Sequence, residues 1–167
     1  QHADVAMYEA KRHGQGYAVY QAEQDQYSLG RLRIVTSLRD RALFDQLQLH
    51  YQPKISLKDG RVCGLEALLR WRHPTLGEIE PDTFIPVAER VGVMRQITLW
   101  VLRTALQQME VWQKAGFPLH VAVNLSVRNL GDENLPQDIR EILAAHAVPP
   151  AHITLEVTES GMMVNPR

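Results

Sequence analysis

The sequence predicts an α/β fold built on a sheet whose later strands run parallel. Strand-like runs at residues 119–127 and 153–158 flank a helical pattern, and another strand and a long helix precede them. Such alternation is typical of β-α-β units, whose strands pair in parallel. The chain has 167 residues, of which 45% are hydrophobic and 22% charged. This composition is that of an ordinary globular domain with its own core.

The amino-terminal part predicts helices before the sheet begins. A short helical pattern spans residues 3–11 and ends at Gly14 and Gly16, and residues 17–20 predict a brief strand. A connecting helix is then expected within residues 21–46, because apolar residues recur there at three- and four-residue spacing. These residues are Leu29, Leu32, Val35, Leu38, Ala42 and Leu43.

A β-hairpin is expected next. Residues 47–57 alternate apolar and polar side chains, as a strand with one buried face does. Pro53 has no N–H to donate, which indicates an edge or irregular strand. The turn signal at residues 58–60 predicts that a strand over residues 62–72 returns antiparallel to the first. The lone Cys63 is expected to be a small core residue, and a loop is expected around Pro74 and Gly77.

Two helices and two strands complete the expected elements. Asp82 or Thr83 is expected to cap a helix that ends at Gly92, and residues 93–115 show one broad apolar face. The strand over residues 119–127 is followed by a helix that opens near Pro136. The proline pair at residues 149–150 is expected to close that helix before the last strand.

Charge and motif content exclude several function classes. The net charge is −1 and the pI about 6.7, so neither a nucleic-acid polymer nor an anionic membrane is expected as a main partner. No apolar run approaches the roughly 18 residues of a membrane span. Zinc-site, nucleophile-elbow and P-loop motifs are absent.

The single cysteine fits a reducing compartment, so we expect this segment to be cytoplasmic. The parent protein could still be anchored to a membrane through regions that are not in this chain.

Three strand-like runs each carry an oxygen-bearing side chain on their less apolar face. Glu66 lies in the first, Asn124 in the second and Glu156 in the third. Such oxygens are hard ligands, suited to Mg²⁺, Mn²⁺ or Ca²⁺. A hydrogen-bonded or partly solvated role for each residue is the competing interpretation, and the pattern alone leaves both open.

Five segments in order resemble the motifs of an EAL domain, a family of bacterial phosphodiesterases that hydrolyse cyclic di-GMP. They are Tyr51-Gln52-Pro53, Gly64 to Trp71, Phe84 to Gly92, Val123 to Ser126 and Leu155 to Glu159. The resemblance implies a (β/α)₈ TIM-type barrel whose first strand is antiparallel to the rest. Such barrels have about 250 residues, so residues 47–167 are expected to form the amino-terminal half.

The resemblance also implies a metal site. Glu66, Asn124 and Glu156 match metal ligands of the family, for one or two Mg²⁺ or Mn²⁺ ions. Glu66, Glu156 and Glu159 form the expected catalytic set, in which Glu159 matches a residue that anchors a loop beside the site. The implied chemistry is two-metal hydrolysis of a phosphodiester to the linear dinucleotide pGpG.

Further positions match the pocket of the family. Gln52 and Arg70 match substrate contacts, and Arg70 shares a strand face with Glu66. Phe84 and Pro86 are interpreted as packing residues in preference to pocket-shaping ones.

The residues before the sheet are similar to another family. Residues 3–14 resemble the last helix of a GGDEF (diguanylate cyclase) domain, although that family continues Gly-Arg-Asn where this chain has Gly14, Gln15 and Gly16. The expected organisation is a GGDEF tail at residues 1–20, the connecting helix at residues 21–46 and the half EAL domain at residues 47–167.

The leading functional hypothesis is that the parent protein is a cyclic di-GMP phosphodiesterase in bacterial second-messenger signalling. An aspartate pair and a lysine of the family are expected beyond Arg167, so the 167-residue chain alone is expected to be inactive. The alternative is a catalytically inactive EAL receptor that binds the dinucleotide and signals through the connecting helix. A homodimer of the parent is left open.

Overall fold

A computed structural model describes residues 22–157, with side chains from residue 30 onward. The expected helix at residues 3–11 and strand at residues 17–20 lie outside this range. The helices are α2 (Ala22–Leu38), α3 (Leu43–Gln46), α4 (Pro81–Val91), α5 (Met94–Lys114) and α6 (Leu135–Ala144), with 3₁₀ turns at Val127–Gly131 and Pro150–His152. The strands are β1 (Leu47–Ile55), β2 (Val62–His73), β3 (Gly77–Ile79), β4 (Val121–Leu125) and β5 (Ile153–Val157).

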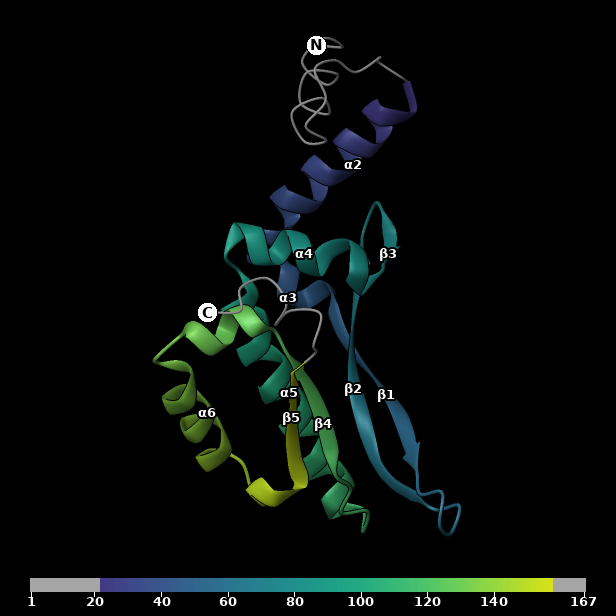
Figure 1. The fold of residues 1–167 in the computed structure, drawn as a ribbon, viewed down its shortest axis with the longest axis vertical. Helices are drawn as coiled ribbons and strands as arrows, with labels where there is room; N and C mark the ends of the chain where they lie inside the picture. Colours follow the sequence, from purple (N-terminus) through teal and green to yellow (C-terminus); the bar gives the residue numbers. More distant parts are fainter. Residues whose placement is uncertain (1–21, 158–167) are drawn as a thin grey trace, which may run out of the picture.

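The strands form one sheet in the order β1-β2-β4-β5, with β3 paired to β2. β1 and β2 are antiparallel, whereas β2, β4 and β5 are parallel. The helices α5 and α6 lie against one face of the sheet, and α4 crosses above the ends of β2 and β4 (Figure 1). This α/β arrangement with an antiparallel first strand confirms the predicted partial barrel. The parallel strands end at the edge below α4, so side chains there converge.

The β1–β2 hairpin confirms the expectation drawn from Pro53. β1 is an end strand of the described sheet, and its register with β2 shifts between Lys54 and Ile55. The turn closes through a 2.8 Å hydrogen bond from the Ser56 N–H to the Arg61 carbonyl. The tip of the hairpin projects beyond the helices (Figure 1). Cys63 lies in this projecting part and is exposed, so its expected core position was wrong.

The segment after β2 differs from the expected loop. Gly77–Ile79 forms a short strand that pairs antiparallel with the end of β2. Helix α4 then begins at Pro81, so Asp82 and Thr83 lie inside its first turn and do not cap it. Proline is favoured there because its missing N–H has no helical partner in any case. Gly92 ends the helix as expected, with a φ of 80° that suits a residue without a side chain.

The core lies between the sheet and the helices. The expected broad face of α5 is buried, including Ile97, Leu102, Ala105 and Leu106. Phe84 of α4 is fully buried, and its ring meets that of Trp71 edge-on at a centroid distance of 5.3 Å. The packing interpretation of Phe84 is therefore confirmed.

The later elements are shorter than expected. β4 ends at Leu125, because the Ser126 hydroxyl accepts the Arg128 N–H and starts a 3₁₀ turn. Helix α6 ends at Ala144, before the proline pair that was expected to close it. After it, the Ala147 N–H donates to Glu110 of α5 over 2.8 Å, which fixes the turn to a neighbouring helix. This hydrogen bond, together with His146, lowers the pKa of Glu110.

The expected connecting helix is divided into α2 and α3 by a turn at residues 39–42. α2 packs against α4, and Leu38 at its end is buried. The Ser37 hydroxyl also lies 2.8 Å from Nε2 of His73, at the end of β2. The connecting segment is therefore attached to the same strand that carries Glu66. No helix of the described residues is both long and apolar enough to cross a membrane.

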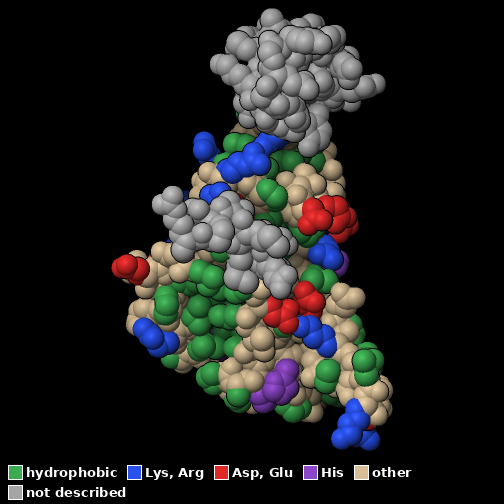
Figure 2. Space-filling model, viewed as in Figure 1, with side chains coloured by type: hydrophobic (Ala, Val, Ile, Leu, Met, Phe, Trp, Pro, Cys, Tyr) green, Lys and Arg blue, Asp and Glu red, His purple; other side chains and the backbone are tan. Residues whose placement is uncertain are grey.

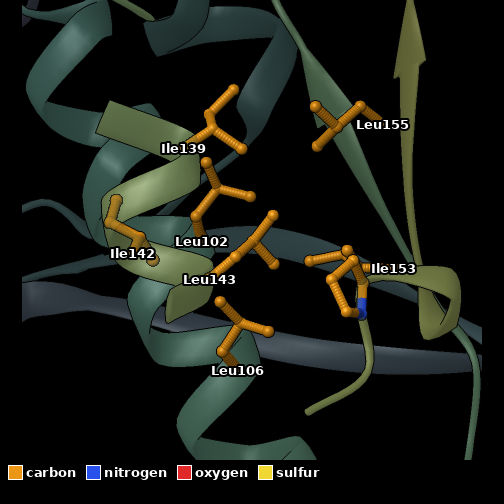
Figure 3. A pocket seen from close by; sticks show the side chains of 8 residues that line it. Leu102, Leu106, Ile139, Ile142, Leu143, Ile153 and Leu155 are labelled. Carbon is orange, nitrogen blue, oxygen red and sulfur yellow. The ribbon is translucent and has the colours of Figure 1, made fainter. Parts of the chain in front are cut away.

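A small apolar cavity remains between α5, α6 and β5 (Figure 3). Its volume is about 180 Å³. The residues that line it are Leu102, Leu106, Ile139, Ile142, Leu143, Pro150, Ile153 and Leu155. These side chains face away from the polar face of the sheet, so this cavity is separate from the candidate site below.

Tyr51 provides a test of the packing on the helical side of β1. Its ring contacts Trp112 edge-on at 4.8 Å, while its hydroxyl is buried without a hydrogen-bond partner among the described residues. Burial raises the pKa of Tyr51 to about 12. We expect Tyr51→Phe to raise the free energy of unfolding by about 1 kcal/mol, because it removes an unpaired buried hydroxyl. Urea denaturation measures this, and a loss of stability would show that the hydroxyl has a partner.

Candidate active site

The three predicted oxygen ligands lie on adjacent strands and on one face of the sheet. Asn124 pairs in register with Glu156, and Glu66 pairs with Ala122, two residues before Asn124. The Nδ2 atom of Asn124 donates to Oε1 of Glu66 over 2.8 Å. The strands therefore bring Glu66, Asn124 and Glu156 together, as the sequence predicted.

A cavity of about 660 Å³ lies beside residues 66–70 of β2 and the end of β4, where α4 forms its opposite wall. Its polar lining comes from β2, from β4 and the residue after it, and from α4 and α5. The lining residues that carry polar side chains are Glu66, Arg70, Asp82, Glu89, Thr98, Asn124 and Ser126. On the face seen in Figure 2, acidic and basic side chains lie next to each other, beside a hydrophobic surface.

The two expected substrate contacts occupy different places. Arg70 lines the cavity, and its Nη1 atom donates to the Leu69 carbonyl over 2.8 Å. Gln52 is exposed on β1 directly beside Glu66, but it does not line the cavity. Pro86 is exposed and lines the cavity from α4, so its interpretation as a packing residue was wrong. Glu159 lies outside the described residues, so its expected role stays a prediction.

Lys54 was not predicted as a site residue. Its Nζ atom lies 2.5 Å from Oε1 of Glu156, across the sheet from β1 to β5. Alternation along β1 places Lys54 on the same face as Gln52. This shared face is the sequence feature from which Lys54 could have been predicted as a site residue.

A second cluster of polar residues connects the end of β4 to α4. The Ser126 hydroxyl donates to Oε1 of Glu89 over 2.7 Å, and the Arg128 guanidinium donates to the Glu89 carbonyl over 3.3 Å. Ser126 shares the face of Asn124 in the sequence pattern, but the alternation of the strand could not name its partner on a distant helix. These hydrogen bonds hold the helical wall of the cavity against the end of β4.

The side chains of Glu66, Asn124 and Glu156 could form part of the ligand shell of a hard divalent cation. Two carboxylates and one amide supply oxygens, the donors that Mg²⁺ and Mn²⁺ prefer. The ammonium of Lys54 on Glu156 also shows that this position attracts a cation. Within residues 30–157, no group of three or more His, Cys, Asp or Glu residues is placed to hold a metal ion.

Comparisons with known proteins identify the family of this chain. The family model described as "EAL domain" matches residues 36–167. MucR of Pseudomonas aeruginosa, a bifunctional diguanylate cyclase/cyclic di-GMP phosphodiesterase, is 41% identical over 163 residues, which cover 96% of this chain and 24% of MucR. PdeR of Escherichia coli, a cyclic di-GMP phosphodiesterase, is 39% identical over 98% of this chain and 25% of its own length. The chain thus spans about a quarter of these relatives.

Solved structures show the same fold. A phosphodiesterase structure of MucR in complex with c-di-GMP has a TM-score of 0.73 and 42% identity, over 80% of this chain and 54% of that one. The FimX EAL domain of Xanthomonas citri, also in complex with c-diGMP, has a TM-score of 0.69 and 28% identity, over 83% and 53%. Sequence, fold and the matched segments agree, and the chain belongs to the EAL-domain family.

Proposed function

We propose that the complete protein containing this chain hydrolyses cyclic di-GMP to pGpG. One observation carries the proposal: Glu66, Asn124 and Glu156 share one face of adjacent strands, and two of them line the 660 Å³ cavity. That volume is typical of small-molecule sites. MucR and PdeR, which are named as cyclic di-GMP phosphodiesterases, support the substrate and the reaction.

In this proposal, each residue of the site has one task. Glu66, Asn124 and Glu156 would hold Mg²⁺ or Mn²⁺, and the bound ion would activate water and stabilise charge on the phosphate. Asn124 can ligate only through its amide oxygen, whereas its amide nitrogen now donates to Glu66. Arg70 would bind and orient a phosphate through its guanidinium.

Four further assignments belong to the same proposal. Gln52 would contact the substrate from β1, and Glu159 would position a loop beside the site. The amino-terminal residues would be the tail of a GGDEF domain, as in a bifunctional relative such as MucR. The single cysteine of the chain supports a cytoplasmic location for this segment.

The experiment is a hydrolysis assay of the complete protein with Mg²⁺ and cyclic di-GMP, in which chromatography separates the substrate, pGpG and GMP. The proposal expects pGpG as the product. A complete protein that carries all ligands and yields no pGpG would contradict it.

An inactive receptor is the second candidate. The FimX EAL domain, a similar structure solved with c-diGMP, supports binding of the dinucleotide, a property that this candidate shares with the first. Calorimetric binding of cyclic di-GMP by a complete protein that forms no pGpG would establish this alternative.

Arg70 gives a prediction about substrate affinity. Hydrogen bonds to charged groups contribute about 1.5–3 kcal/mol, so we expect Arg70→Ala to raise KM for cyclic di-GMP about 10- to 100-fold. Arg72→Ala is the matched control, because Arg72 lies two residues further along β2, is exposed and does not line the cavity. Steady-state kinetics of both variants measure the difference. An equal effect of the two variants would remove Arg70 from the site.

A further inference from the structure

Lys54 reaches a residue that is 102 positions away in the sequence. Its Nζ atom donates to Oε1 of Glu156 over 2.5 Å. β2 and β4 lie between the strands of the two residues, and Lys54 pairs in register with Gly64 of β2. Neighbouring strands are about 4.8 Å apart, so a lysine crosses two strands most readily where the sheet curls toward it. Gly64 has no side chain that would obstruct Lys54 on that face.

Each of the two carboxylates proposed as metal ligands has its own hydrogen-bond donor. Glu66 accepts a hydrogen from the Asn124 amide, and Glu156 accepts one from the Lys54 ammonium. An ammonium has three donors and no lone pair, so it cannot bridge a carboxylate to a metal ion. It would also repel a cation bound at the same oxygens. Lys54 and a divalent ion would therefore compete for Oε1 of Glu156.

We propose that Lys54 is the internal counter-ion of Glu156, which a divalent cation must displace when it binds. The inference rests on the proposed function, because it takes Glu156 as a metal ligand. Lys54 is thus a positioning residue: it holds the carboxylate on the face of the sheet before the metal arrives, and it weakens metal binding.

An incidental surface ion pair is the competing interpretation, since the Lys54 and Glu156 side chains are 39% and 38% exposed. Exposed pairs of this kind often contribute little to stability. The two interpretations differ in what they predict for metal affinity. An incidental pair leaves that affinity unchanged when the lysine is removed, whereas a competing ammonium does not.

The test measures Mn²⁺ binding by the complete protein, with free Mn²⁺ followed by electron paramagnetic resonance. We expect Lys54→Met to lower the Kd for Mn²⁺ at least threefold and Lys54→Arg to leave it near the wild-type value. Lys58→Met is the control, because Lys58 is an exposed lysine in the nearby hairpin turn. Lys54→Gln replaces the methionine variant if that variant misfolds.

Thermal denaturation supplies a second measurement. We expect Lys54→Met to lower the Tm in EDTA and to show a larger increase in Tm than the wild type when Mn²⁺ is added. In a Glu156→Gln background, Lys54→Met should leave the Tm in EDTA unchanged, since the charge that it pairs with has gone.

Unchanged or weaker Mn²⁺ binding by Lys54→Met overturns the inference, and an equal loss of Tm with and without Mn²⁺ assigns Lys54 a purely structural role. Either result leaves the proposed function intact if the wild type forms pGpG. A wild-type protein that binds no Mn²⁺ overturns both.

Discussion

Replacing Glu66 by glutamine in the complete protein is expected to lower kcat for cyclic di-GMP hydrolysis about 10²- to 10³-fold. A bound divalent ion contributes several kcal/mol of charge stabilisation in the transition state, and each 1.36 kcal/mol corresponds to a factor of ten. Glutamine keeps the shape of the side chain and can still accept the hydrogen of the Asn124 amide. It removes the negative charge that a cation requires. Initial rates of pGpG formation measure the effect.

The matched control for Glu66→Gln is Glu78→Gln. Glu78 is an exposed carboxylate on β3 that does not line the cavity. We expect its replacement to leave kcat unchanged. Both variants should unfold within about 0.5 kcal/mol of the wild type, as surface substitutions usually do. Full activity of Glu66→Gln, or a loss of activity explained by unfolding, would remove Glu66 from the catalytic set.

The second large effect concerns stability and the wall of the cavity. Phe84→Ala is expected to lower the free energy of unfolding by about 3–5 kcal/mol, because it deletes a fully buried ring. That ring fills the space between α4 and Trp71 of β2, the strand that also carries Glu66. A domain with ordinary marginal stability would lose a large part of that stability. Urea denaturation of the complete protein measures the loss.

Phe84→Leu is the control for this prediction. Leucine keeps most of the apolar volume but loses the edge-on contact between the rings, so we expect a clearly smaller loss than for alanine. Similar losses for the two variants would indicate that the ring contributes through something other than filled volume. A loss below about 1 kcal/mol for alanine would contradict the buried position of Phe84.

The parts of the fold that depend on local chemistry were predictable from the sequence. Pro53 indicated an edge strand, Gly92 indicated the end of a helix, and the apolar face of residues 93–115 became the buried face of α5. Alternation along the strands placed Glu66, Asn124 and Glu156 on the less apolar face of each strand. The family resemblance then predicted that these residues bind a metal ion. The parallel order of β2, β4 and β5 then brought the three residues together.

Features that depend on tertiary contacts were not predictable in this way. β3 has three residues and exists because the end of β2 offers it a partner. Helix α6 ends before its prolines, in a turn that donates a hydrogen bond to Glu110 of α5. The Lys54–Glu156 ion pair depends on how the sheet curls, and this curvature cannot be predicted from the residue pattern of a single strand. The pairing of Ser126 with Glu89 likewise required the position of α4.

The most direct test of the central claim is the rate of pGpG formation by the complete protein as the concentration of Mg²⁺ is varied, with binding of cyclic di-GMP measured in the same samples. We predict no hydrolysis in EDTA, a rate that rises to saturation with Mg²⁺ or Mn²⁺, and loss of that rate in Glu66→Gln. Cyclic di-GMP that binds but is not hydrolysed at any concentration of either metal would contradict the claim and identify a receptor.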